Sequence, residues 1–202
     1  TKESGPIKMP VALIDVLAAH QLKEGLLLAL LKKEKTNKGS LVQVSLYDTA
    51  LASLKNQATN WLMNNFIPER IGSLHPNIAP YGETFKTKDG FSLVLAIGTD
   101  KHFKMLLSIL KANKIASKKD FHNNQLRVSN RIELAKELQP FFESKTKDEL
   151  MPSFLKQNIP VGVIRNIKEV FENNVAKSLI LNEKIEEIDT KRVKTAVFKI
   201  SD

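Results

Sequence analysis

The sequence of 202 residues contains no cysteine, which excludes disulfide bonds and thiolate metal ligands. It also lacks a long apolar run, because the longest, at residues 26–31, falls far short of the roughly 18 residues of a membrane span. Tyrosine and tryptophan, which stack on bases, are scarce, with two tyrosines and one tryptophan. The missing cysteines fit a reducing compartment, so the sequence predicts a cytoplasmic protein without a membrane partner.

The net charge of +9 raises the question of a nucleic-acid partner. The lysines are spread along the chain, however, and their densest groups, at residues 32–35 and 118–120, are accompanied by acids. A solvated basic surface therefore explains the charge better than a nucleic-acid footprint. A basic binding module without catalysis stays open as an alternative, and DNA binding that weakens steeply with salt would indicate it.

The first third of the chain has the pattern of an α/β protein. Residues 11–14 form a short apolar run typical of a buried strand, and residues 16–33 have the spacing of a helix buried on most sides. After a turn at 36–39, the alternation at 41–46 predicts a strand, and 47–64 a second helix. This order predicts one βα repeat of a doubly wound, parallel, Rossmann-like sheet. Because a complete sheet needs more strands, we expect a fragment or a processed chain.

Prolines and glycines interrupt residues 66–82, which predicts a linker or a crossing loop. Residues 83–97 have the pattern of a β-hairpin with Asp89 and Gly90 at its turn, and Asp100 is expected to cap a helix at 101–111. Further helices are predicted at 129–143, 146–157 and 166–173, an extended segment at 159–164, and strands at 178–187 and 193–200. The expected parts are a remnant of a large α/β domain (1–65), a crossing linker (66–82), a small α+β domain (83–160) and a return segment (161–202).

A single carboxylate, Asp15, stands between the first predicted strand and the long helix. One interpretation is structural: Asp15 caps the helix by accepting a hydrogen bond from a backbone N–H. The other is chemical. A helix N-terminus favours the ionised carboxylate, and apolar neighbours such as Leu13 and Ile14 leave it poorly hydrated and therefore more nucleophilic toward an acyl carbon. Periodicity does not choose between the two.

The order of motifs along the chain resembles that of family III CoA-transferases, the CaiB/BaiF group. In that family a nucleophilic aspartate precedes a long apolar helix, and a turn of the form E-K-T-G-K-G-Q and a V-x-V-S-L-x-D segment follow. Here the turn and the segment are residues 34–40 and 42–48. The resemblance continues through four more segments and covers nearly the whole chain: 70–81, 85–90, 124–131 and 159–162.

The chain departs from the family pattern in three places. Asn37 and Ser40 stand where the family usually has glycine and glutamine. Residues 16–20 are bulkier than the glycine-rich segment that often follows the aspartate, and the glycine-rich loop found in some members is absent.

The resemblance implies that Asp15 attacks the thioester of an acyl-CoA and passes the CoA to a small carboxylic acid through covalent intermediates. It implies acyl-CoA as a substrate with no tightly bound cofactor, an N-terminal CoA-binding domain, and an interlocked homodimer. It also points to His75 and Tyr81 as close to the substrate, and to Lys35 and Lys38 as contacts for the CoA phosphates. For these four residues an ordinary structural or solvated role stays open.

An acyl-CoA racemase or epimerase of the same superfamily is an alternative, with Asp15 as an acid or base. That chemistry needs a second proton carrier on the opposite face of the α-carbon, and the family takes this histidine from its N-terminal half. The chain's own histidines are not paired at metal-ligand spacing, so no metal is expected; they are His20, His75, His102 and His122. Arg127, Asn130 and Arg131 are expected to hold the small domain together.

Overall fold

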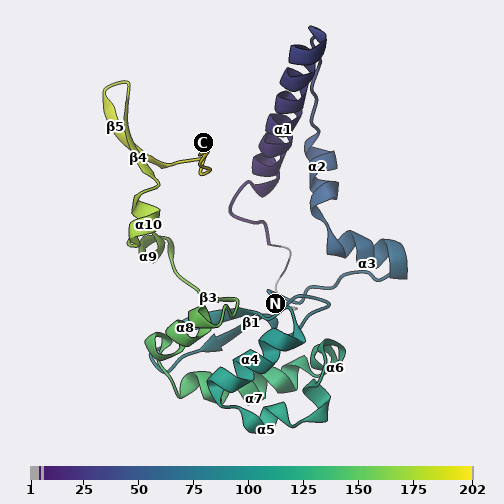
Figure 1. Ribbon diagram of the computed structural model, residues 1–202, viewed down its shortest axis with the longest axis vertical. Coiled ribbons are helices and arrows are strands. Elements are labelled where there is room, and N and C mark those ends of the chain that lie inside the picture. The colour runs from purple at the N-terminus through teal and green to yellow at the C-terminus, as the bar shows by residue number, and fades with distance from the viewer. Residues whose placement is uncertain (1–4, 6, 202) are drawn as a thin grey trace. The chain divides into compact units, whose positions relative to one another are not determined.

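The structure, a computed structural model, describes residues 5 and 7–201 and divides into two compact units, Thr1–Gly72 and Ser73–Asp202 (Figure 1). The boundary between the units falls inside the segment 66–82, which is rich in proline and glycine. Helices and strands are both present, and both described sheets are antiparallel.

The first unit contains α1 (Leu13–Thr36), α2 (Leu46–Ser53) and α3 (Asn56–Asn64). The long helix predicted at 16–33 is therefore confirmed as α1. It ends at Asn37, whose φ of 54° is left-handed and whose N–H donates to the Lys33 carbonyl at 2.7 Å. A left-handed residue stops a right-handed helix, which explains the turn predicted at 36–39.

Both strands predicted for this unit are wrong. Residues 11–12 precede α1 and residues 13–14 open it, while residues 41–45 pair with no strand in the part of the chain that the structure describes. Val42 instead packs on α1, where a Cβ added at Gly25 would lie 2.7 Å from its Cγ1. The helix predicted at 47–64 is also interrupted, because Lys55 has a φ of 47° between α2 and α3.

Although α1 is rich in leucine, none of its residues is buried. The exposed fractions of its exposed leucines range from 38% to 67%. A helix with apolar side chains all round is typical of an interior position, so the expected burial on most sides is wrong for this unit by itself. Within the described residues, no helix, α1 included, is long and apolar enough to cross a membrane.

The second unit is built on the antiparallel sheet β1-β2-β3, formed by β1 (Tyr81–Lys86), β2 (Ser92–Ala96) and β3 (Val161–Val163). The predicted hairpin at 83–97 is confirmed as β1 and β2. β3 lies within the predicted extended segment 159–164 and pairs with β2.

The turn of this hairpin is held by side chains as well as by its backbone. Gly90 has a φ of 82°, and its N–H donates to the Thr87 carbonyl at 2.9 Å. Oδ1 of Asp89 accepts from the Thr87 hydroxyl at 2.5 Å and from the Lys147 N–H at 3.0 Å. The Thr87 hydrogen bond, foremost, holds the pKa of Asp89 below its ordinary value because it stabilises the ionised form.

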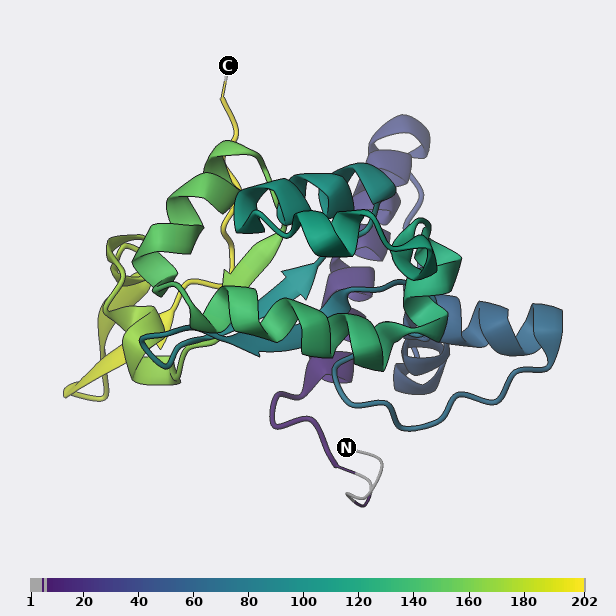
Figure 2. The same cartoon turned by 90° about the horizontal axis from the view of Figure 1, so that it is seen from below.

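Helices α4 (Asp100–Leu110) and α7 (Arg131–Glu143) cover one face of the three-stranded sheet (Figures 1 and 2). Every buried hydrophobic side chain of the described chain lies between Ala79 and Ile159. The rings of Phe85 on β1 and Phe142 on α7 stack at 4.6 Å. The core thus lies in this unit, whose helical elements up to residue 156 are α4 (Asp100–Leu110), α5 (Asn113–Ala116), the 3-10 helix η1 (Lys119–Phe121), α6 (Asn124–Ser129), α7 (Arg131–Glu143) and α8 (Lys147–Lys156).

The helices predicted in this unit are found, but the cap predicted for one of them is wrong. The helix predicted at 146–157 is α8, with a capping box between Thr146 and Glu149. The helix predicted at 129–143 begins at Arg131. Asp100 does not cap α4: the hydroxyl of Thr99 accepts from the His102 N–H at 3.1 Å, and Asp100 is the first helical residue. Asp100 is therefore available for the arginine contact described below.

The C-terminal part contains α9 (Ile167–Phe171), α10 (Asn174–Lys177) and the hairpin of β4 (Ile180–Ile185) and β5 (Ile188–Val193). The strand predicted at 193–200 is wrong, because the chain reverses earlier, at Glu186 and Glu187. Their φ values of 49° and 65° suit a two-residue hairpin turn that normally contains Asn or Gly. The sequence has two glutamates at this turn, so it does not indicate where the hairpin reverses.

Candidate functional site

Asp15 lies exposed in the first turn of α1. The N-cap residue of this helix is Ala12, and no side chain caps it, whereas Ser45, Thr99 and Thr146 cap α2, α4 and α8. The structural interpretation of Asp15 as a cap is therefore wrong. Its carboxylate stands at the positive end of a helix of 24 residues, which favours an anion.

The V-x-V-S-L-x-D segment at 42–48 builds the start of α2. The Ser45 hydroxyl accepts from the Asp48 N–H at 3.2 Å, and the Ser45 carbonyl accepts from the Thr49 N–H at 3.0 Å and the Thr49 hydroxyl at 2.8 Å. Thr49 is buried within the first unit. The serine of this motif thus has a local structural role as the cap of α2.

A hollow of about 620 Å³ runs beside α1 and the segment 42–55, lined among others by Gln21, Glu24 and Asp48. Asp15 does not line it. Lys35 is in the last turn of α1, 20 residues after Asp15, so the rise of 1.5 Å per residue separates them by about 30 Å along the helix. Lys38 follows beyond the end of the helix. The first unit therefore does not bring the two lysines to Asp15.

His75 and Tyr81 lie together in the second unit: His75 is part of a loop, residues 73–80, and Tyr81 is the first residue of β1. The His75 N–H donates to the Tyr81 carbonyl at 2.8 Å, and the two rings meet edge to face at 5.1 Å. Nδ1 of His75 accepts from the Asn77 N–H at 3.1 Å. The expected role of His75 in ordering its loop is thus present, and its ring is held against Tyr81.

Gly82 makes the close return of this loop possible. The Ser73 hydroxyl donates to the Gly82 carbonyl at 2.7 Å, and Gly82 has a φ of 92°. A Cβ at this position would lie 1.8 Å from the Ser73 carbonyl oxygen. Only glycine fits both this backbone conformation and this contact.

The outer part of the 73–80 loop is held by side chains of α6 and α7. Asn124 accepts from the Ala79 N–H at 3.2 Å and donates to the Asn77 carbonyl at 2.7 Å. One nitrogen of the Arg131 guanidinium, Nη2, donates to the carbonyls of His75 and Ile78 at 2.9 and 2.8 Å. Backbone groups that face inward in this loop thereby find partners that the loop itself does not supply.

Arg127 is fully buried and joins the loop to the rest of the unit. It donates to the carbonyls of Ala79 and Phe121 at 2.8 and 3.2 Å and to Asp100 at 2.7 Å, and it stacks over Phe103 at 4.5 Å.

Asn130 also ties backbone together, donating to the carbonyls of Leu126 and Asp120 at 3.0 and 3.3 Å. The expected structural role of Arg127, Asn130 and Arg131 is confirmed.

The sequence reasoning missed Glu83, whose buried carboxylate pairs with Arg131. A usable indication was present: Glu83 and Phe85 alternate in a predicted strand, so they share one face, and a carboxylate on a core face requires a cationic partner.

Comparison with known proteins shows the family of this chain. The model of CoA-transferase family III matches residues 1–202. The chain belongs to CoA-transferase family III. An acyl-CoA transferase of Fusarium pseudograminearum is 33% identical over 183 residues, which is 90% of this chain and 40% of that protein. Human succinyl-CoA:glutarate CoA-transferase is 32% identical over 166 residues, 82% of this chain and 37% of that protein.

The crystal structure of a CaiB/BaiF family protein from Brucella suis superposes with a TM-score of 0.70 at 29% identity, covering all of this chain and 52% of that one. The chain thus spans about half, or less, of the family members that it matches. The resemblance read from its motifs is confirmed, and so is a mixed helix-and-strand fold of the CaiB/BaiF type.

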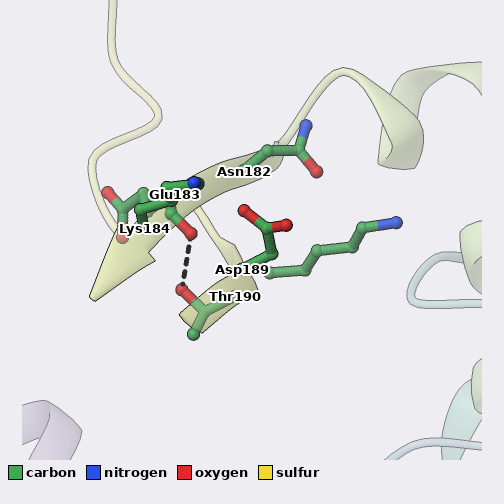
Figure 3. Close-up of a pocket in the computed structure, with 6 residues that line it drawn as sticks. Asn182, Glu183, Lys184, Asp189 and Thr190 are labelled. Carbon is green, nitrogen blue, oxygen red and sulfur yellow. Dashed lines mark hydrogen bonds between the residues drawn. The ribbon is translucent and has the colours of Figure 1, made fainter. Parts of the chain in front are cut away.

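A second hollow, of about 350 Å³, lies on the hairpin β4–β5 and is lined by Asn182, Glu183, Lys184, Asp189, Thr190 and Lys191 (Figure 3). All of its lining comes from two neighbouring strands, and the Thr190 hydroxyl is already bonded to the Glu183 carbonyl at 3.0 Å. Glu183 also forms a two-pronged ion pair with Arg192, whose hydrogen bonds lower the pKa of the carboxyl. This surface offers no convergent reactive groups, and the described chain contains no cluster of three metal-ligating side chains.

Proposed function

We propose that this chain is the C-terminal part of an acyl-CoA:carboxylate CoA-transferase and that Asp15 is its nucleophile. The observation that carries the proposal is the family match over all 202 residues, together with relatives named as CoA-transferases. Human succinyl-CoA:glutarate CoA-transferase suggests dicarboxylic acids as the substrate class, so succinyl-CoA and glutarate are the first pair to assay.

In the proposed reaction, the Asp15 carboxylate attacks the thioester carbonyl of the donor and expels the CoA thiolate, forming a mixed anhydride. The thiolate then attacks the aspartyl carbonyl, releasing the donor acid and leaving an aspartyl-CoA thioester. The acceptor carboxylate attacks this thioester, and the thiolate returns to the new acyl group, which regenerates Asp15. The uncapped N-terminus of α1 supports this role, because its positive end stabilises both the ionised carboxylate and the oxyanion formed next to it.

The remaining residues take secondary roles in this proposal. His75 and Tyr81, whose rings are fixed against each other, border the substrate, and Lys35 and Lys38 contact CoA phosphates. Residues 1–65 belong to a large CoA-binding domain, 66–82 cross to a small domain at 83–160, and 161–202 return. The complete protein is a homodimer in the cytoplasm; the absence of cysteine from the chain favours a reducing compartment.

The test uses the complete protein with succinyl-CoA and hydroxylamine. An aspartyl hydroxamate at Asp15, found by peptide mass spectrometry, is the expected result. Exchange of the α-hydrogen for deuterium without trapping would instead indicate a racemase. Asp48→Asn is a matched control, since Asp48 also lies in a helical first turn; it should leave trapping at Asp15 intact, whereas Asp15→Asn abolishes it.

A further inference from the structure

Glu83 is a buried, charged residue that has no role in the proposed reaction. Its side chain is 7% exposed, and its single ionic partner in the described structure is Arg131, with 3.2 Å between Oε1 and Nε. Neither oxygen of the carboxylate, nor Nε of Arg131, has a hydrogen bond among the described residues. The pair is therefore held by charge attraction and not by aligned hydrogen bonds.

The surroundings of Glu83 argue against a ligand site. A hollow of about 480 Å³ lies between β1 and α7, and its lining includes Glu83, Phe85, Arg131 and Ile132. Both carboxylate oxygens, however, are buried, so they are closed to a molecule in that hollow. What the carboxylate reaches is the guanidinium of Arg131.

Arg131 in turn carries the 73–80 loop. Its Nη2 donates to the carbonyls of both His75 and Ile78, so the orientation of one guanidinium fixes two points of the same turn. Among the described residues, Arg131 has no ion-pair partner other than Glu83. Its side chain is 15% exposed, so without that partner its flexible stem would let the guanidinium turn toward water. A buried negative charge beside Nε prevents that rotation.

We propose that Glu83 is a positioning residue: its charge anchors Arg131, and Arg131 holds the turn that presents the rings of His75 and Tyr81. The positioning of the turn does not depend on the transferase chemistry. Only the purpose of the turn, to border the substrate, rests on the proposed function.

The test is amide hydrogen exchange in the complete protein, read at His75, Asn77 and Ala79. Glu83→Gln keeps the shape of the side chain and removes its charge. We expect these amides to exchange faster by about tenfold or more, because the guanidinium is left without its buried counter-ion. Glu133→Gln makes the same chemical change at an exposed position of α7 and should leave the exchange of the loop unchanged.

A double variant separates loop positioning from stability. Glu83→Gln combined with Arg131→Gln leaves no unpaired buried charge, so the core of the unit should stay protected while the three loop amides exchange as fast as in Arg131→Gln alone. Two results would overturn the proposal. One is loop exchange in Glu83→Gln at the wild-type rate. The other is that Glu83→Gln accelerates loop exchange as much in the Arg131→Gln background as it does in the wild type. Unchanged trapping at Asp15 alongside faster loop exchange would remove the loop from the proposed catalysis and leave the positioning role standing.

Discussion

Leu138 on α7 and Leu30 on α1 show how differently the two units use the same residue. Leu138 is fully buried, in a core whose members all lie between Ala79 and Ile159, whereas Leu30 is 61% exposed on a helix without a buried residue. Both helices carry leucines four residues apart, Leu134 and Leu138 on α7 and Leu26 and Leu30 on α1. Hydrophobic spacing therefore predicts that a helix will pack, but not that its packing partner lies in the same unit.

The two units also differ in what they contribute to the proposed site. The second unit holds its own core and fixes the 73–80 loop with buried polar contacts. The first unit carries the proposed nucleophile on a helix that has no interior of its own. We infer that Asp15 depends on surfaces outside the first unit, whereas the loop depends on residues of its own unit.

The largest expected effect on stability comes from replacing Arg127. Arg127→Met removes donors from the buried region around the carbonyls of Ala79 and Phe121, and we expect a loss of about 3–5 kcal/mol in the free energy of unfolding. Urea unfolding followed by circular dichroism measures it. Arg192→Met, which breaks an exposed ion pair, is the matched control and should change stability little. Equal losses for the two arginines would contradict the role of Arg127 in joining the 73–80 loop to the rest of the unit.

Replacing the two leucines tests the comparison itself. Leu138→Ala should cost about 2–5 kcal/mol, because a cavity opens in the core. Leu30→Ala on exposed α1 should stay within about 0.5 kcal/mol in this chain. A cost at Leu30 as large as that at Leu138 would mean that α1 is buried against other protein surface.

A smaller effect is expected at the start of α8. Thr146→Ala removes the hydroxyl that accepts from the Glu149 N–H at 3.3 Å, and should cost about 1 kcal/mol. Thermal unfolding measures it. Thr36→Ala, at the last turn of α1, removes a bond from a hydroxyl to the Lys32 carbonyl and serves as the control with little effect. A larger loss at Thr36 would contradict the contrast between the two units.

The smallest effect concerns pH. The pKa of Asp89 is lowered in the folded chain, so its ionised form adds stability that is fully present above the ordinary aspartate pKa and is lost as the pH falls through the lowered value. Asp89→Asn should therefore lower the melting temperature at neutral pH and flatten its decline in acid. Parallel melting profiles for the two proteins would contradict this role.

The sequence predicts most local structure where the causes are local. The hairpin turn at Asp89 and Gly90 and the helix at 146–157 depend on neighbouring residues, and both are confirmed. The strand at 41–46 is not, because its pairing would require strands that the described residues do not supply. The alternation of Glu83 and Phe85 indicates a buried carboxylate, but its partner Arg131 lies 48 residues away, so no local pattern identifies that partner. His75 and Tyr81 were predicted to lie close to the substrate, but the shape of their loop depends on side chains of α6 and α7 that are distant in sequence.

The most direct test of the account is the fate of oxygen in the transfer. In the proposed pathway the acceptor leaves one of its carboxylate oxygens on Asp15 in each turnover. The complete protein is incubated with succinyl-CoA and with glutarate whose carboxylates carry heavy oxygen. The mass of the peptide that contains Asp15 is then measured by mass spectrometry. We predict heavy oxygen in the Asp15 carboxylate and none in Asp48. Rapid CoA transfer with no label at Asp15 would contradict the account.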